Sequence, residues 1–419
     1  MKVASSAIGL VLLCSACATA PVGSPLPVAA PESVGVSGSG LAQIDAFIDR
    51  LQREGKLAGA VTVVARHGRL VSLKAHGEAD VERHRAMRAD DLFQLQSMTK
   101  PIATVAALQL VEQGRLQLFD PVAKFLPGFA DMKVAVPRGD APGGHALVAA
   151  ERPITILDLL THRAGFVGLA TRDSPAARLQ RQAYAARPHD PSENLEQAVA
   201  FLATLPLGDQ PGSAFRYGPA TIVLSRVIEI VTGQTLEVAL REQIFRPLGM
   251  HDTHFVVPPH KHSRVMPPYQ FRPDRGLVRM ALDPLAPRLL SAGGNLWSTA
   301  ADYLRFCQML LNGGELDGTR ILSRASVALM TTPQVDTVPL SFLPGHAFGL
   351  GVALRRADAP DSVPGSPGTY GWSGAYSTWF RIAPREQAVY ALFVQLAFTP
   401  ADSELQRGFH AAAVSSHTP

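Results

Sequence analysis

The chain has 419 residues, of which 47% are hydrophobic and 18% charged, a composition that is ordinary for a soluble globular protein. This length suits two or three domains, or one large core with a sizeable insertion. The 39 basic and 35 acidic residues leave a net charge of only +4, and no basic run is interleaved with aromatic residues. A nucleic-acid partner is therefore not expected.

The first twenty residues have the pattern of an export signal. Lys2 precedes an apolar stretch at residues 7–13, which is too short to span a bilayer. The small residues before Cys17 resemble the bacterial lipoprotein cleavage box, although Cys14 stands where leucine is usual. We expect an exported protein, either a periplasmic or outer-membrane lipoprotein lipidated at Cys17 or a plainly secreted one. We expect the protein to contact the membrane only through a lipid anchor at Cys17.

Beyond the signal, residues 21–38 are rich in Pro, Ser, Ala and Gly and are typical of a tether. Apolar residues at helical spacing predict a helix over residues 41–54. The β-branched run at 60–66 and the stretch at 70–75 flank the turn His67-Gly68. This pattern predicts a β-hairpin.

Ser97 and Lys100 stand three residues apart in the only S-x-x-K of the chain, before an apolar run that ends at Gly114. Pro101 is tolerated only near a helix start, so the helix should begin close to Ser97 and place it at the positive end of the helix dipole. Residues three apart share a helix face, so the hydroxyl and the amine can meet. A lysine in an apolar setting can activate the serine as a nucleophile. The alternative is a capping serine beside a solvated lysine.

The remaining elements suggest one sheet built from both ends of the chain. Short helices are predicted at 154–162, 195–205 and 221–232, strands at 348–354, 377–382 and 389–396, and a closing helix at 403–414. We expect an α/β (α+β) fold, an antiparallel sheet flanked by helices with a mostly helical lobe inserted. The predicted divisions are a signal peptide (1–20), a tether (21–38), an α/β domain (39–130 and 290–419) and a helical domain (131–289).

Several motifs together resemble the serine β-lactamase-related superfamily, from roughly residue 35 to the C-terminus. They are QSMTKP at 96–101, GRLQLFDPV at 114–122, ITILDLLTH at 154–162, PGSAFRY at 211–217, PLGM at 247–250 and SAGGNLWSTA at 291–300. Within this superfamily the chain is most similar to the family VIII carboxylesterases, which share the fold of class C β-lactamases. The resemblance implies a β-lactamase/transpeptidase-like fold.

The resemblance also implies roles for further residues. Tyr217 matches the tyrosine that begins the second motif, so Ser97, Lys100 and Tyr217 would be catalytic, with either Lys100 or Tyr217 as the formal base. β-Lactamases carry Asn two residues after this tyrosine, whereas Pro219 stands here. A side-chain amide that would hold a β-lactam carbonyl is therefore missing.

The third motif is matched by the segment YGWSGA at 370–375. Trp372 stands where β-lactamases have a lysine, and Trp-x-Gly resembles the esterases. Trp372 would offer substrate an apolar surface and one N–H donor, and Gly374 would let the strand approach the substrate. The backbone N–H groups of Ser97 and Ala375 would form the oxyanion hole.

Four histidines cluster at 251, 254, 260 and 262, but without a His-Glu-x-x-His pattern. We interpret their segment as a solvated loop and expect no metal and no cofactor.

Together these features predict a serine hydrolase that cleaves short-chain carboxylic esters through an acyl-enzyme, with a small-molecule ester as its substrate. The first alternative is a β-lactamase or a D-Ala-D-Ala-type peptidase, which Trp372 and Pro219 disfavour. The second is a non-catalytic cell-envelope binding protein on the same fold. The presence of all three reactive side chains weakens that second alternative.

Overall fold

The computed structural model describes residues 25–138, 144–169, 171, 173–188, 190–336, 338, 343–397 and 400–417, without the side chains of 400–403. Cys17 and the export signal lie outside these residues, so lipidation and export stay predictions. Within the described part, no helix is both long and apolar enough to cross a membrane.

An eight-stranded antiparallel sheet forms the centre of the molecule, in the order β12-β13-β14-β15-β16-β1-β2-β3. The strands are β1 (Gly59–Arg66), β2 (Arg69–Asp80), β3 (Arg85–Ala86), β12 (His346–Phe348), β13 (Ala353–Arg355), β14 (Tyr370–Ser373), β15 (Trp379–Ala383) and β16 (Ala388–Phe393). Strand β1 pairs with β16, with Val61 opposite Phe393, so the two ends of the chain meet in one sheet. The predicted fold class is confirmed.

Helices cover both faces of this sheet because β1 is apolar on both of its sides. Val61, Val63 and Ala65 belong to the core that includes α2 (Thr99–Glu112) and α8 (Ala300–Leu311). Ala60 and Val64 belong to a second core with α1 (Gly38–Arg53) and α10 (Pro400–Ser415). Strand residues alternate between faces, so the sheet is the middle layer of three.

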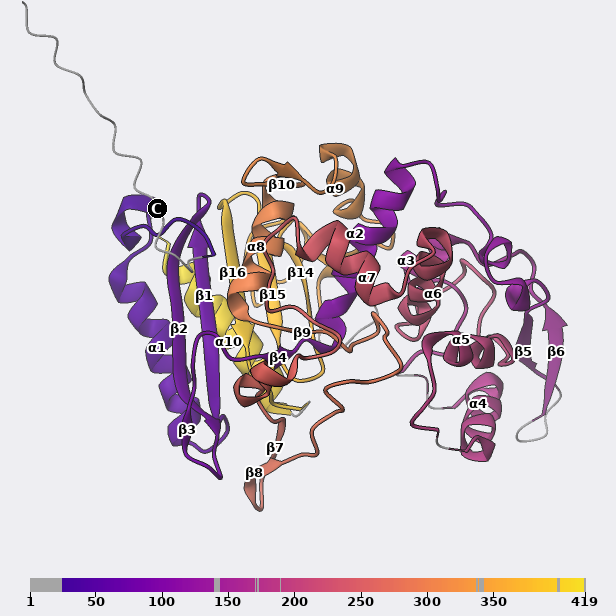
Figure 1. The fold of residues 1–419 in the computed structure, drawn as a ribbon, viewed down its shortest axis with the longest axis horizontal. Coiled ribbons are helices and arrows are strands. Elements are labelled where there is room, and N and C mark those ends of the chain that lie inside the picture. Colours follow the sequence, from indigo (N-terminus) through magenta and orange to yellow (C-terminus); the bar gives the residue numbers. More distant parts are fainter. Residues whose placement is uncertain are drawn as a thin grey trace, which may run out of the picture.

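A lobe made largely of short helices lies at the other end of the molecule from α1 (Figure 1). It contains α3 (Ile156–Leu160), α4 (Pro175–Ala186), α5 (Leu195–Ala203), α6 (Ala220–Thr232) and the hairpin of β5 (Lys133–Pro137) and β6 (His145–Ala149), and α7 (Leu236–Leu240) follows α6. The remaining elements are the pairs β4 (Phe93–Gln94) with β9 (Trp297–Ser298), β7 (Tyr269–Arg272) with β8 (Gly276–Arg279) and β10 (Glu315–Leu316) with β11 (Thr319–Arg320), and helix α9 (Arg324–Met330). The domain boundaries given above stay predictions.

The structure differs from the sequence prediction in several elements, three of which are instructive. The strand expected at 348–354 is two strands, β12 and β13, joined by a turn in which Gly351 has a φ of 70°; only glycine adopts this conformation readily. Helices α4 and α8 were not predicted. Each carries a recognisable start signal, because the side chains of Ser174 and Thr299 cap their first turns.

Candidate active site

Ser97 lies in the 3-10 turn Gln96–Met98, which leads directly into α2, and Lys100 lies in the first turn of that helix. The Nζ atom of Lys100 donates to the Oγ atom of Ser97 at 3.0 Å. The predicted helix start near Ser97 and the predicted meeting of the two side chains are both present. Gln96, just before Ser97, has a positive φ of 48°, an uncommon conformation that fixes the approach to the serine.

Lys100 is buried, with 6% of its surface exposed. Its Nζ atom also donates to the carbonyl oxygen of Gly293 at 2.7 Å and lies 5.0 Å from the centre of the Tyr217 ring. Among the described residues, no carboxylate forms an ion pair with it. The turn that carries Gly293 is held by two serines, since Ser291 Oγ accepts the N–H of Gly293 and Ser225 Oγ accepts that of Ala292. The amine is therefore held against Ser97 by fixed backbone.

Tyr217 lies just before α6 and faces Lys100 with its ring. The Nε1 atom of Trp372 donates to the Tyr217 hydroxyl at 3.3 Å, and the two rings are 5.3 Å apart. Ser97, Lys100 and Tyr217 line the same cavity, together with Pro219 and Ala375. The structure thus brings together the three residues predicted to be catalytic.

Two third-motif residues make close contacts with other parts of the protein. Trp372 is only 2% exposed and packs between Tyr217 and Phe348, and its contact with substrate stays a prediction. A Cβ on Gly374 would lie 2.3 Å from the carbonyl oxygen of Leu95. Gly374 therefore permits a close approach to the segment before Ser97, and its approach to substrate stays a prediction.

The cavity has a volume of about 820 Å³, within the range of sites for drug-sized ligands. Part of its wall comes from α4, which contributes Ala177, Gln180 and Tyr184. Asp283 also lines the cavity, and its Oδ2 atom accepts a hydrogen bond from Gln94 Nε2 at 2.8 Å. The sequence analysis missed these wall residues, although the Ser174-Pro175 helix start could have indicated α4.

His162 supports Tyr217 on its other side, which the sequence analysis did not predict. The ring is 2% exposed and lies 4.8 Å from the Tyr217 ring. Burial and the charge of Lys100 lower the pKa of His162 to about 3. The ring is therefore neutral near pH 7, and it acts as an aromatic support that adds no second positive charge beside Lys100.

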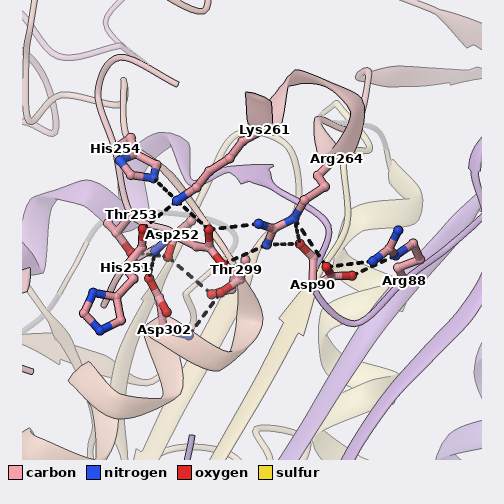
Figure 2. A network of polar contacts seen from close by, with 11 residues as sticks. Arg88, Asp90, His251, Asp252, Thr253, His254, Lys261, Arg264, Thr299 and Asp302 are labelled. Atoms are coloured by element: carbon pink, nitrogen blue, oxygen red, sulfur yellow. Dashed lines mark hydrogen bonds and ion pairs between the residues drawn. The ribbon is translucent and has the colours of Figure 1, made fainter. Parts of the chain in front are cut away.

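Three of the four clustered histidines, His251, His260 and His262, are exposed, in line with the predicted solvated loop. His254 is half-buried, and Lys261 Nζ lies 3.0 Å from its Nε2 atom. Figure 2 shows that Lys261 and Arg264 both reach Asp252, at 2.8 Å in each case. This network ties the 251–264 segment to the start of α8 through Asp302, which accepts from the N–H of Asp252. Within the described residues, no group of three or more His, Cys, Asp and Glu side chains is placed to hold a metal ion.

We expect His254 to make the fold sensitive to acid. Burial, followed by the charge of Lys261, lowers the pKa of His254 to about 4. As the pH falls, the unfolded chain therefore binds a proton at His254 before the folded chain does. The stability that neutral His254 contributes is complete above about pH 6.5 and is lost as the pH falls toward 4. Between pH 7 and pH 5 the wild type should lose free energy of unfolding, and His254→Gln should reduce this loss by about 1–2 kcal/mol, measured by urea unfolding. His84→Gln, at a side chain that is 84% exposed, is the control, and equal changes in both variants would contradict the assignment.

The family model described as Beta-lactamase matches residues 44–415. The chain belongs to the β-lactamase family. The resemblance drawn from the motifs is therefore confirmed.

Relatives of this β-lactamase-family chain include both esterases and penicillin-binding proteins. Esterase EstB of Burkholderia gladioli is 34% identical over 363 residues, which cover 81% of this chain and 86% of EstB. Penicillin-binding protein 4 of Amycolatopsis lactamdurans is 30% identical over 355 residues, covering 82% of each chain. The solved structure of EstCE1, a hydrolase with promiscuous acyltransferase activity, is 27% identical and superposes with a TM-score of 0.74 over 90% of this chain and 98% of its own.

Proposed function

We propose that this hydrolase of the β-lactamase family cleaves short-chain carboxylic esters through an acyl-enzyme. The observation that carries the proposal is the contact of Lys100 Nζ with Ser97 Oγ at 3.0 Å, in the wall of an 820 Å³ cavity. A serine hydroxyl becomes an effective nucleophile when a positioned base takes its proton. The similarity to esterase EstB supports esters as the substrate class.

In the proposed reaction Ser97 Oγ attacks the ester carbonyl carbon while the pair of Lys100 and Tyr217 takes the hydroxyl proton. Lys100 and Tyr217 pass this proton to the departing oxygen, and the alcohol leaves. Water then attacks the acyl-enzyme carbonyl and gives a proton to the same pair. That proton returns to Ser97 as the acid departs, so the enzyme is restored.

The oxyanion of each tetrahedral intermediate would be held by the backbone N–H groups of Ser97 and Ala375. Both residues line the cavity. No acceptor within the described part of the chain takes the N–H of Ala375, which leaves it able to donate to substrate. Two fixed donors of this kind stabilise developing charge without reorganisation.

The rival activities have less support. The similarity to Penicillin-binding protein 4 favours a β-lactamase or D-Ala-D-Ala-type peptidase. Against this activity, Pro219 lines the cavity where a side-chain amide would be needed. Trp372 also stands where these enzymes have the third-motif cation. A non-catalytic binding protein would not require the Lys100–Ser97 contact.

Wild-type protein should hydrolyse p-nitrophenyl butyrate with a kcat/KM well above that for nitrocefin. The reason is that a cephalosporin carries a carboxylate, and no lysine stands at the third motif to pair with it. Loss of a charge-assisted hydrogen bond costs about 1.5–3 kcal/mol, roughly a tenfold to hundredfold change in rate. A preference for nitrocefin would overturn the esterase proposal and favour the β-lactamase.

We also propose that the protein is exported, with Cys17 as its lipid anchor. Sequencing the N-terminus of the mature chain decides this, because a start beyond Cys17 would contradict lipidation.

A further inference from the structure

A buried arginine lies on the sheet face opposite the active-site helix α2. Arg381 of β15 is 6% exposed, and its Nη1 atom donates to the carbonyl oxygens of Trp372 and Phe380 at 3.2 and 2.8 Å. Its guanidinium lies 4.7 Å from the ring of Trp379, which packs against α10. In the described part of the chain, no carboxylate pairs with Arg381. A buried charge without a counter-charge is costly.

Two further polar atoms near this arginine also lack partners. His410 of α10 is 6% exposed and Thr369 is 1% exposed, and neither His410 Nε2 nor Thr369 Oγ1 has a hydrogen-bond partner among the described residues. Both atoms converge on Gly365, where an added Cβ would lie 3.2 Å from the first and 3.3 Å from the second. Buried polar atoms nearly always have a hydrogen-bond partner. Two unpaired atoms that lie beside the same residue therefore indicate a partner that both would contact.

The surroundings of these atoms are basic. The ring of His410 lies 4.9 Å from that of Trp379, the same ring that the Arg381 guanidinium contacts. Burial, and then the charges of Arg381, His346 and Arg355, lower the pKa of His410 well below its usual value. The backbone N–H of Arg355 donates to the carbonyl of Thr369, while its guanidinium donates to the carbonyl oxygens of Val363 and Arg356. The local potential is therefore positive.

We propose that Arg381, His410 and Thr369, here named the Arg381 cluster, bind one small inorganic anion of the size of chloride. A buried water would satisfy Thr369 and His410 but would leave the charge of Arg381 uncompensated. An anion would satisfy these two side chains and also compensate the charge. The donors are a guanidinium N–H, the Thr369 hydroxyl and the His410 Nε2–H of the tautomer that carries its proton there. Atoms of His410 and Thr369 lie only 3.1–3.3 Å from the position of an added Gly365 Cβ, so a monatomic anion fits this crowded position better than phosphate or sulfate.

The position of the Arg381 cluster gives the anion a structural role. Arg381 holds the carbonyl of Trp372, and the indole of Trp372 donates to the Tyr217 hydroxyl. An anion that fixes Arg381 therefore braces strand β14 behind the cavity. The inference concerns binding and stability, so it stands whether or not the substrate is an ester.

Crystals of the full chain grown or soaked in sodium bromide test the site directly. We expect an anomalous bromide peak within hydrogen-bond distance of Arg381 and Thr369. A water without anomalous signal at this position, in crystals that show bromide elsewhere, would overturn the proposal.

Thermal unfolding supplies a second test. At constant ionic strength, exchanging sodium gluconate for sodium chloride from 1 to 100 mM should raise the Tm of the wild type by about 2–4 °C, because a ligand of the folded state stabilises it. Thr369→Val removes one donor at nearly constant volume and should abolish most of this shift. Arg83→Met, at a side chain that is 75% exposed, is the control and should retain it. An equal chloride shift in the Thr369→Val variant would refute the site.

Discussion

Replacing Ser97 by alanine should lower kcat/KM for p-nitrophenyl butyrate by about a thousandfold or more, because removal of a nucleophile leaves only the contribution of binding and oxyanion stabilisation. The Tm should change little. Ser97 is half-buried, and its side chain accepts one hydrogen bond, from Lys100, worth about 0.5–1.5 kcal/mol. Lys100 keeps the carbonyl of Gly293 as its second acceptor.

A fluorophosphonate probe connects this loss to the serine itself. The wild type should gain one covalent label, located on Ser97 by peptide mass spectrometry, and the Ser97→Ala variant should gain none. Ser291→Ala is a suitable control, since Ser291 also lines the cavity but its hydroxyl accepts from the backbone of Gly293. Retained turnover in a clean Ser97→Ala preparation, or a label on Ser291, would remove Ser97 from the mechanism.

The contact between Ser97 and Lys100 was predictable because its geometry is local. Ser97 and Lys100 are three positions apart at a helix start, and a helix brings such residues together whatever surrounds them. The hairpin of β1 and β2 followed in the same way from two β-branched runs and the turn His67-Gly68. In these cases the pattern of neighbouring residues determines the contact.

Contacts between distant segments were beyond sequence reasoning. Gly293, which accepts from Lys100, is 193 positions away from it, and Trp372 is 155 positions from Tyr217. The motif identified Trp372 as important, but alternation along β14 cannot tell that its indole packs against Tyr217. Similarly, His162 stood inside a recognised motif, yet its burial against Tyr217 depends on how α3 packs on α6. Packing between elements, rather than propensity, decided each of these roles.

Trp372 should therefore control the rate through Tyr217 and the choice of substrate through its lack of charge. Trp372→Phe keeps an aromatic ring between Tyr217 and Phe348 but removes the N–H that the Tyr217 hydroxyl accepts at 3.3 Å. Losing one such hydrogen bond costs about 0.5–1.5 kcal/mol, so ester turnover should fall about two- to tenfold. Trp372→Lys removes the same donor and adds an ammonium that a cephalosporin carboxylate can pair with.

The two variants separate these effects when kcat/KM is measured for p-nitrophenyl butyrate and nitrocefin on each protein. In Trp372→Phe both substrates should lose similarly, because Tyr217 serves the proton transfer of either reaction, and the ester-to-nitrocefin ratio should stay near that of the wild type. In Trp372→Lys the ratio should move toward nitrocefin by about tenfold to a hundredfold, the value of one charge-assisted hydrogen bond. Because Trp372 is 2% exposed, burying an ammonium there should also lower the Tm, so both variants are compared below their unfolding transitions. If Trp372→Phe shifts the ratio as far as Trp372→Lys, charge at the third motif is not what separates ester from lactam in this protein.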